Sequence, residues 1–113
     1  MKKDEVMAMS DLELNSMVWT MLYTEKPWKH WANADGTVTI NGEKTSIADY
    51  ATDMAAAWKL AEQADISVIR VGNEWWAGKF DGSNGDWWFD LGPIENTSAA
   101  RAITQMFILV MAE

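Results

Sequence analysis

Apolar residues recur every three or four positions over residues 10–23, which predicts an amphipathic helix. The segment opens with Ser10-Asp-Leu-Glu13, which fits a capping box. In that motif the serine side chain accepts from the third helical N–H, and the glutamate reaches back to the cap. The expected apolar face consists of Leu14, Met17, Val18, Met21 and Leu22.

Two further segments have helical character. Residues 52–64 are rich in strong helix formers, with Thr52 as the expected cap. Their expected buried stripe consists of Met54, Ala57, Trp58 and Ala61. Residues 97–112 begin at polar capping candidates (residues 96–98) and are apolar on most sides. A helix of that kind is usually covered on more than one side, so we expect it between a sheet and another element or at a subunit contact.

Runs of β-branched and aromatic residues between turn signals predict the strands. Residues 37–47 form a hairpin around Asn41-Gly42, where both residues tolerate positive φ. Residues 66–71 and 74–80 are joined by a two-residue Gly-Asn link, which fits a second antiparallel hairpin, and residues 87–91 form a further strand. Helices packed on an antiparallel β-sheet of three to five strands make an α+β domain.

Length and composition fit one globular domain. The chain has 113 residues, of which 49% are apolar, enough for a core without metal or disulfides. The absence of cysteine excludes a disulfide scaffold, a zinc ribbon and a thiol nucleophile. The N-terminal segment lacks an apolar h-region and the longest apolar run, Met106 to Ala112, is too short to span a bilayer. We therefore expect an intracellular protein with no membrane contact.

The net charge of −8 argues against direct nucleic-acid binding, in which basic side chains displace counterions from phosphates. Residues 46–113 contain ten acids and four bases, a local charge of −6. One interpretation is a solvated surface that maintains solubility. The other is an acidic face that occupies a basic groove on a nucleic-acid-binding partner, with Asp81, Asp86, Asp90 and Glu95 as the candidate contacts.

The eight tryptophans are unusual for a chain of this length. Trp75-Trp76 and Trp87-Trp88 are adjacent pairs on predicted strands, so each pair places one indole on each face of the sheet. If helices cover both faces, all four indoles belong to the core. The alternative is a ligand or nucleotide pocket, in which Trp76 and Trp87 are walls and Arg70 or Arg101 contacts a phosphate.

Residues 26–36 contain turn formers without a clear period and predict an irregular loop. Trp28 and Trp31 lie there beside two lysines and a histidine, in the one locally basic part of the chain. Exposed aromatic residues next to cations are common contact anchors. Packing of this loop against the first helix explains the same residues equally well.

No pattern in the sequence indicates catalysis. His30 has no serine, cysteine or acidic partner at a recognisable motif spacing. The Asp81–Asp86 segment lacks the carboxylates that a calcium loop requires at its fifth and twelfth positions, and the glycines form no phosphate-binding fingerprint. We expect no catalytic residue, no metal and no cofactor.

Four segments resemble small phage proteins. The start of the first predicted helix, Ser10–Asn15, resembles the start of NinX-type proteins of lambdoid phages. The second helix and the strand after it resemble the helix and strand in the middle of that family, at Asp53–Trp58 and Ile66–Ile69. The start of the last helix, Ala99–Ala102, resembles the family's terminal helix. The Ala-rich helix before the Trp75-Trp76 strand is similar to the wider group of phage proteins with an ABA-sandwich domain. This resemblance implies a phage gene product with an α/β/α layered fold, located in the host cytoplasm. The family has no established activity, so the resemblance implies no catalytic residue.

We therefore expect a small acidic phage accessory protein that acts by binding a host protein, such as a nucleic-acid-handling or defence factor. The alternatives are the tryptophan-lined ligand pocket and self-assembly through helix 97–112. In that helix Ile108, Leu109 and Met111 could lack a partner within the chain.

Overall fold

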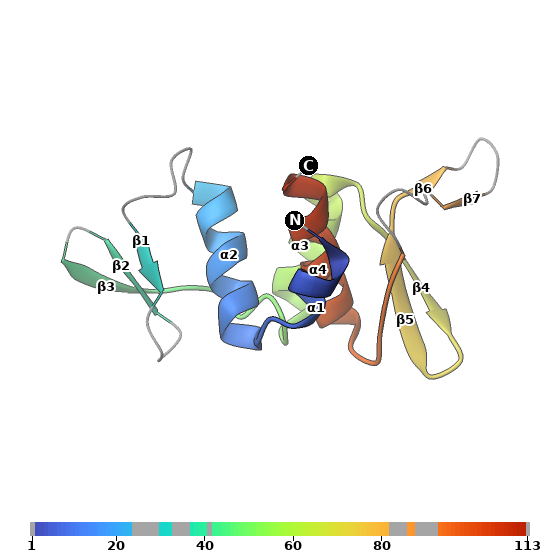
Figure 1. Cartoon of the computed structure of the whole chain (residues 1–113), viewed down its shortest axis with the longest axis horizontal. Helices are drawn as coiled ribbons and strands as arrows, with labels where there is room; N and C mark the ends of the chain where they lie inside the picture. Colours follow the sequence, from blue (N-terminus) through green and yellow to red (C-terminus); the bar gives the residue numbers. More distant parts are fainter. Residues whose placement is uncertain are drawn as a thin grey trace.

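The computed structural model describes residues 2–23, 30–32, 37–40, 42–81, 86–87 and 93–112. These residues form helices and antiparallel strands, as Figure 1 shows. In chain order the elements are α1 (Lys3–Met7), α2 (Asp11–Tyr23), β1 (His30–Ala32), β2 (Thr37–Ile40), β3 (Glu43–Ser46), α3 (Met54–Ala64), β4 (Ser67–Val71), β5 (Glu74–Gly78), β6 (Phe80–Asp81), β7 (Asp86–Trp87), β8 (Ile94–Asn96) and α4 (Ala99–Met111).

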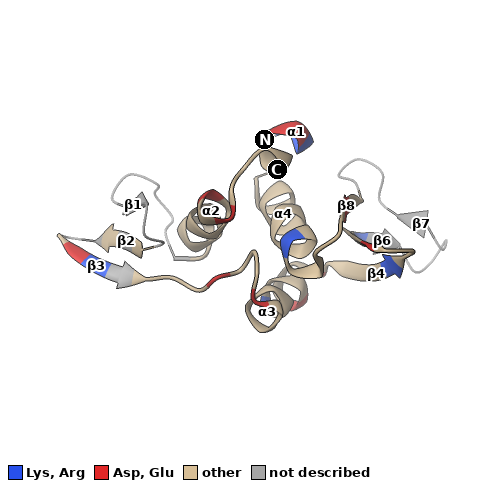
Figure 2. Cartoon of the chain, turned by 90° about the horizontal axis from the view of Figure 1, so that it is seen from below, with Lys and Arg blue, Asp and Glu red and all other residues tan. Residues whose placement is uncertain are grey.

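The helices lie between two sheets. Sheet β1-β2-β3 flanks α2 on one side, and sheet β4-β5-β8 packs against α4 on the other, while β6 and β7 form a separate ribbon (Figures 1 and 2). The prediction of an α+β domain with helices packed on an antiparallel sheet is confirmed. The layer order is not the sheet-between-helices order that the phage resemblance implies, because helices occupy the middle of the molecule.

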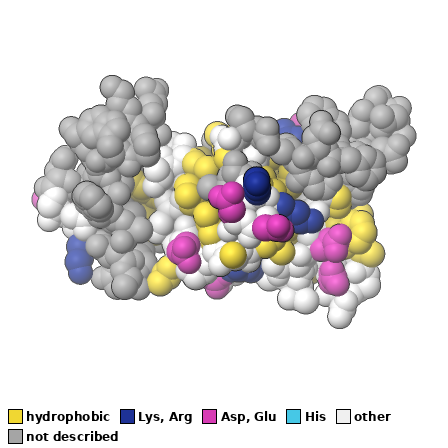
Figure 3. Space-filling view, viewed as in Figure 1, with side chains coloured by type: hydrophobic (Ala, Val, Ile, Leu, Met, Phe, Trp, Pro, Cys, Tyr) yellow, Lys and Arg dark blue, Asp and Glu magenta, His cyan; other side chains and the backbone are white. Residues whose placement is uncertain are grey.

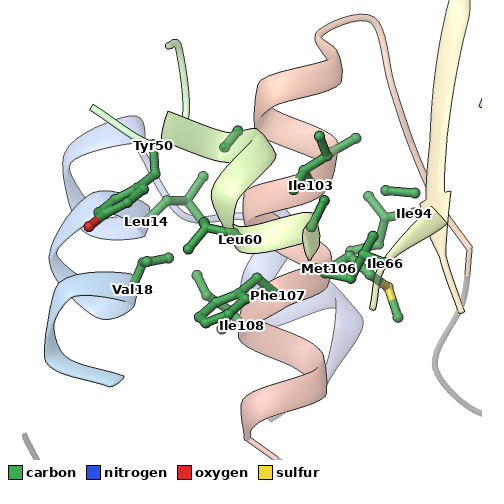
Figure 4. Packing of buried hydrophobic residues seen from close by; sticks show 14 of the residues in the cluster. Leu14, Val18, Tyr50, Leu60, Ile66, Ile94, Ile103, Met106, Phe107 and Ile108 are labelled. Atoms are coloured by element: carbon green, nitrogen blue, oxygen red, sulfur yellow. The ribbon is translucent and has the colours of Figure 1, made fainter. Parts of the chain in front are cut away.

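Helix α4 is the centre of the core. Nine of its residues, 100 and 102–109, are buried, and α1, α2, α3, β5 and β8 all pack against it. In Figure 4 side chains from α2 and α3 reach α4 from one side, and Ile66 and Ile94 reach it from the other. The prediction that this helix is covered on more than one side is confirmed. Ile108 and Leu109 are buried within the chain, so the premise that they lack a partner is wrong.

The capping box at the start of α2 is confirmed. The backbone N–H of Glu13 donates to the Ser10 hydroxyl at 3.2 Å, and the Ser10 N–H donates to the Glu13 carboxylate at 3.1 Å. The hydrogen bond that the Ser10 backbone N–H donates to the Glu13 carboxylate holds the pKa of Glu13 below its ordinary value of 4.5. A hydrogen bond with the Ser10 side chain makes a smaller contribution in the same direction.

The cap of α3 differs from the prediction. Thr52 does not cap the helix; instead, the Asp53 carboxylate accepts from the Ala55 N–H at 3.0 Å. Thr52 lies one residue earlier, in a turn. The polar run offered two side chains suited to capping, and the backbone turns into the helix at the second of them.

The predicted buried stripe of α3 is only half right. Ala57 and Ala61 are buried, whereas Met54 and Trp58 are 41% and 48% exposed. The actual stripe consists of Ala57, Leu60, Ala61 and Ala64. Met54 and Trp58 lie at its margin, because α3 turns its small residues and Leu60 toward α4.

Both predicted hairpins are present with two-residue turns. Gly42 and Gly72 adopt φ values of 84° and 64°, in the left-handed region that favours glycine. The second hairpin is shorter than predicted, because β5 ends at Gly78 and the chain pairs again as β6 with β7. Of the predicted strand 87–91, only Trp87 belongs to a described strand, and residues 88–92 lie outside the described residues.

Two strands were not predicted. β8 is the third strand of sheet β4-β5-β8, and β1 lies within the stretch predicted as an irregular loop. Both are three residues long, too short to show alternation in the sequence.

Candidate functional site

The register of sheet β4-β5-β8 separates its residues into two faces. Ile94 pairs with Ala77, and Ala77 pairs with Val68, so these three side chains share the face that packs on α4. Ala77 and Ile94 are fully buried there. Arg70 and Trp75 are register partners on the same inner face, with the guanidinium carbon 5.6 Å from the indole centroid.

The opposite face of this sheet points away from the helices. It contains Ile69, Val71, Glu74, Trp76 and Glu95, which we call the outer sheet face. Ile69 and Val71 are 44% and 40% exposed, and Trp76 is partly exposed. Figure 3 shows hydrophobic and acidic side chains next to each other in the part of the molecule where Figure 1 places the β4–β5 hairpin.

Acidic and apolar side chains alternate on the outer sheet face. Trp76 is the register partner of Ile69 on one side and of Glu95 on the other, and Glu74 is the partner of Val71. No lysine or arginine occupies a strand position of this face, because Arg70 points to the inner face. The outer sheet face therefore combines exposed apolar area with negative charge.

The prediction that adjacent tryptophans point to opposite faces of the sheet is correct for Trp75 and Trp76, but the prediction that both are buried in the core is wrong. Trp75 and Trp76 point to opposite faces as predicted, yet both are partly exposed, and helices pack only on the inner face within the described chain. The side chains of Trp87 and Trp88 lie outside the described residues.

The described residues of the predicted ligand pocket lie in different parts of the molecule. Trp76 is on the outer sheet face and Arg70 is on the inner face. Arg101 binds the Asp11 carboxylate and the Met9 carbonyl at the junction of α1 and α2. The Trp87 side chain is outside the described residues. A phosphate site made of these residues is therefore not assembled in the described chain.

The predicted acidic contacts divide into two groups. Glu95 is exposed on the outer sheet face, whereas Asp81 and Asp86 are register partners in the β6–β7 ribbon, and their side chains are outside the described residues. Asp90 also lies outside them. Trp28, a candidate contact residue of the predicted loop, also lies outside the described residues. Trp31 is described only as part of the β1 backbone.

A buried polar network, which the sequence analysis missed, ties α2 to the turn before α3. The Asn15 amide donates to the Asp49 carboxylate at 2.8 Å and accepts from the Ala51 N–H at 2.9 Å. Thr104 on α4 donates to the carbonyl of Tyr50. Asn15 sits among apolar residues of the predicted α2 face, and a polar residue in that position is the one sequence signal that could have revealed the network.

A small recess lies between α2, α3 and the turn before α3. It has a volume of about 260 Å³ and is lined by Leu22, Tyr50, Lys59, Leu60 and Gln63. Typical ligand sites exceed roughly 300 Å³ and contain convergent polar groups. This recess contains none of the predicted ligand-binding residues.

The described residues contain neither a metal-binding cluster nor a helix that could span a membrane. In the described residues, no three histidine or acidic side chains are grouped so that they could hold a metal ion. No helix in the same part of the chain is long and apolar enough to cross a bilayer. Comparison of the chain with protein-family models, curated proteins and solved structures gave no match.

Proposed function

We propose that this chain is a binding protein of phage origin that contacts a host protein through its outer sheet face and catalyses no reaction. The observation that supports this proposal is the exposure of Ile69 and Val71 beside partly exposed Trp76 on a face with two carboxylates. Exposed apolar patches with polar rims are typical of interaction sites. The phage origin rests on the resemblance of helix segments such as Asp53–Trp58 to NinX-type proteins.

Charge defines the chemistry of the proposed partner. With a net charge of −8 and Glu74 and Glu95 on the outer sheet face, this chain complements a surface with basic side chains around an apolar patch. Grooves that bind nucleic-acid backbones are rich in basic side chains, and opposite charge increases the rate of encounter. The β6–β7 ribbon, whose strands contain Asp81 and Asp86, lies at the same end of the molecule (Figure 1).

Reversing the charge of the outer sheet face is expected to weaken partner binding. The variant Glu74→Lys/Glu95→Lys should raise the dissociation constant at least about tenfold, or 1.4 kcal/mol, because both carboxylates lie beside the apolar contact residues. The partner would be captured from host cells with the unaltered chain, purified, and titrated by calorimetry against each variant.

The matched control is Glu43→Lys/Glu62→Lys, which changes the net charge equally at exposed positions on β3 and α3. We expect its dissociation constant to stay within about threefold of the unaltered value, since distant surface charges are largely screened at physiological ionic strength. Equal weakening by the two double variants would show that overall charge, and not the outer sheet face, determines binding.

A further inference from the structure

Among the strands that the structure describes, β4 is an open edge of its sheet. In the order β4-β5-β8 it pairs with β5 only, and Figure 2 shows it at the margin of the molecule. Val71 and Glu74 close the two-residue turn as a hydrogen-bonded pair, so alternate residues 67, 69 and 71 direct their backbone groups toward β5. The N–H and C=O groups of Val68 and Arg70 therefore point outward, where no described backbone group pairs with them.

We propose that β4 pairs in antiparallel orientation with β4 of a second copy of this chain, in a register centred on Ile69. In this register Val68 of each copy faces Arg70 of the other, so all four outward N–H and C=O groups of each strand edge are used. Ile69 lies opposite Ile69 in a non-hydrogen-bonded pair, where side chains are closest. Val71 lies opposite Ser67 on the same face. The exposed Ile69 thus gains an apolar neighbour.

The neighbouring registers are worse. A register centred on Arg70 places two guanidinium groups directly opposite each other, and like charges in that position are destabilising. A register centred on Val68 pairs Arg70 with Ile66, whose N–H already donates to the Ala61 carbonyl at 2.8 Å. The register centred on Ile69 avoids both problems.

The composition of β4 leaves its edge unprotected, and the self-complementary register centred on Ile69 is what favours a second copy as the occupant. β4 has the sequence Ser-Val-Ile-Arg-Val, with no proline and no acid, and edge strands are normally protected by such residues. The only charged residue of β4 is Arg70, whose guanidinium lies over the Trp75 ring of the same chain on the inner face. The other edge of the sheet, β8, is three residues long and exposes Glu95.

The expected dimer is weak and depends on salt. Two five-residue strands form a contact below the area of standard interfaces, so we expect a dissociation constant on the order of 10–100 µM. Two chains of net charge −8 repel each other, so added salt should strengthen the dimer by screening. Pairing would join the two outer sheet faces into one continuous surface, but it does not depend on the function proposed for that surface.

Sedimentation equilibrium of the full chain between about 1 and 500 µM tests the proposal. We expect a monomer–dimer equilibrium, which Ile69→Lys weakens at least about tenfold because two ammonium groups then face each other. Val71→Lys is the matched control on the same face, and it should change the constant by less than about threefold, because its opposite residue is Ser67. A strict monomer over the whole range would overturn the proposal and leave the β4 edge available to a strand from a different protein.

Cysteine cross-linking tests the register directly, since the chain has no cysteine of its own. On mild oxidation, Ile69→Cys should form a disulfide-linked dimer at least about tenfold faster than Val71→Cys, because only the former places the two sulfur atoms in directly opposed positions. Equal rates for the two variants would contradict the register. Neither result bears on partner binding by Glu74 and Glu95, so failure here is distinguishable from failure of the proposed function.

Discussion

Replacing Phe107 by alanine is expected to lower the free energy of unfolding by about 3–5 kcal/mol. Phe107 is fully buried on α4, the helix against which both α2 and the sheet residues pack (Figure 4). Removal of its ring takes away buried apolar area and leaves a cavity that a closely packed core fills only in part. Urea unfolding followed by circular dichroism measures the change, with the slope unchanged if folding remains two-state.

Met111→Ala is the control for this prediction. Met111 is the last residue of the same helix and is 44% exposed, so its truncation should alter the free energy of unfolding by less than about 1 kcal/mol. If the two substitutions destabilised the chain equally, the placement of α4 at the centre of the core would be wrong.

Replacing Asn15 by leucine is expected to lower the free energy of unfolding by about 2–3 kcal/mol. Leucine cannot accept from the Ala51 N–H, which is buried, and cannot donate to Asp49. A buried donor without a partner costs its full desolvation energy, and the added apolar volume does not compensate for it. Thermal and urea unfolding of Asn15→Leu beside the unaltered chain would measure the effect.

Asn15→Asp separates the two bonds of this network. The new carboxylate still accepts from the Ala51 N–H, but it faces the Asp49 carboxylate, so the pKa of the introduced carboxyl group is expected to rise above its unfolded value. A group with a raised folded pKa stabilises below its unfolded pKa and loses that contribution as pH rises through the folded pKa. The deficit of Asn15→Asp should therefore grow from pH 4 to pH 7; a deficit independent of pH would show that Asn15 and Asp49 do not interact.

Local chemistry made α2, α3, α4 and the two hairpins predictable, whereas the five-residue helix α1 was not predicted. The Ser10–Glu13 capping box and the glycines at positions 42 and 72 act over a few residues, so their signals are complete within the sequence. Strands β1 and β8 were missed because each is formed by pairing with a partner elsewhere in the chain and is too short to show its own period.

The layer order could not be predicted because periodicity shows that a face is apolar without showing what covers it. Trp58 and Trp76 illustrate the difference: both were expected in the core, and both lie where a helix or sheet face meets solvent. Large amphipathic side chains are often only partly buried, so composition alone does not settle their burial.

The candidate site was predicted only in part. Glu95 was selected from the acidic excess of the C-terminal half, and it lies on the outer sheet face. Ile69, Val71 and Glu74 were assigned to strands but not to a site, since their shared face follows from the register between β4 and β5. Arg101 was selected for its charge, but Asp11 and the Met9 carbonyl already occupy its guanidinium.

The central claim is that helices occupy the middle of the molecule and leave the outer sheet face open to solvent. The most direct test is paramagnetic broadening of isoleucine methyl signals by a soluble gadolinium chelate, recorded on the dilute, monomeric chain. We expect strong broadening for Ile69 and almost none for Ile94, Ile103 and Ile108, which are fully buried. An Ile69 methyl as protected as that of Ile103 would contradict the claim.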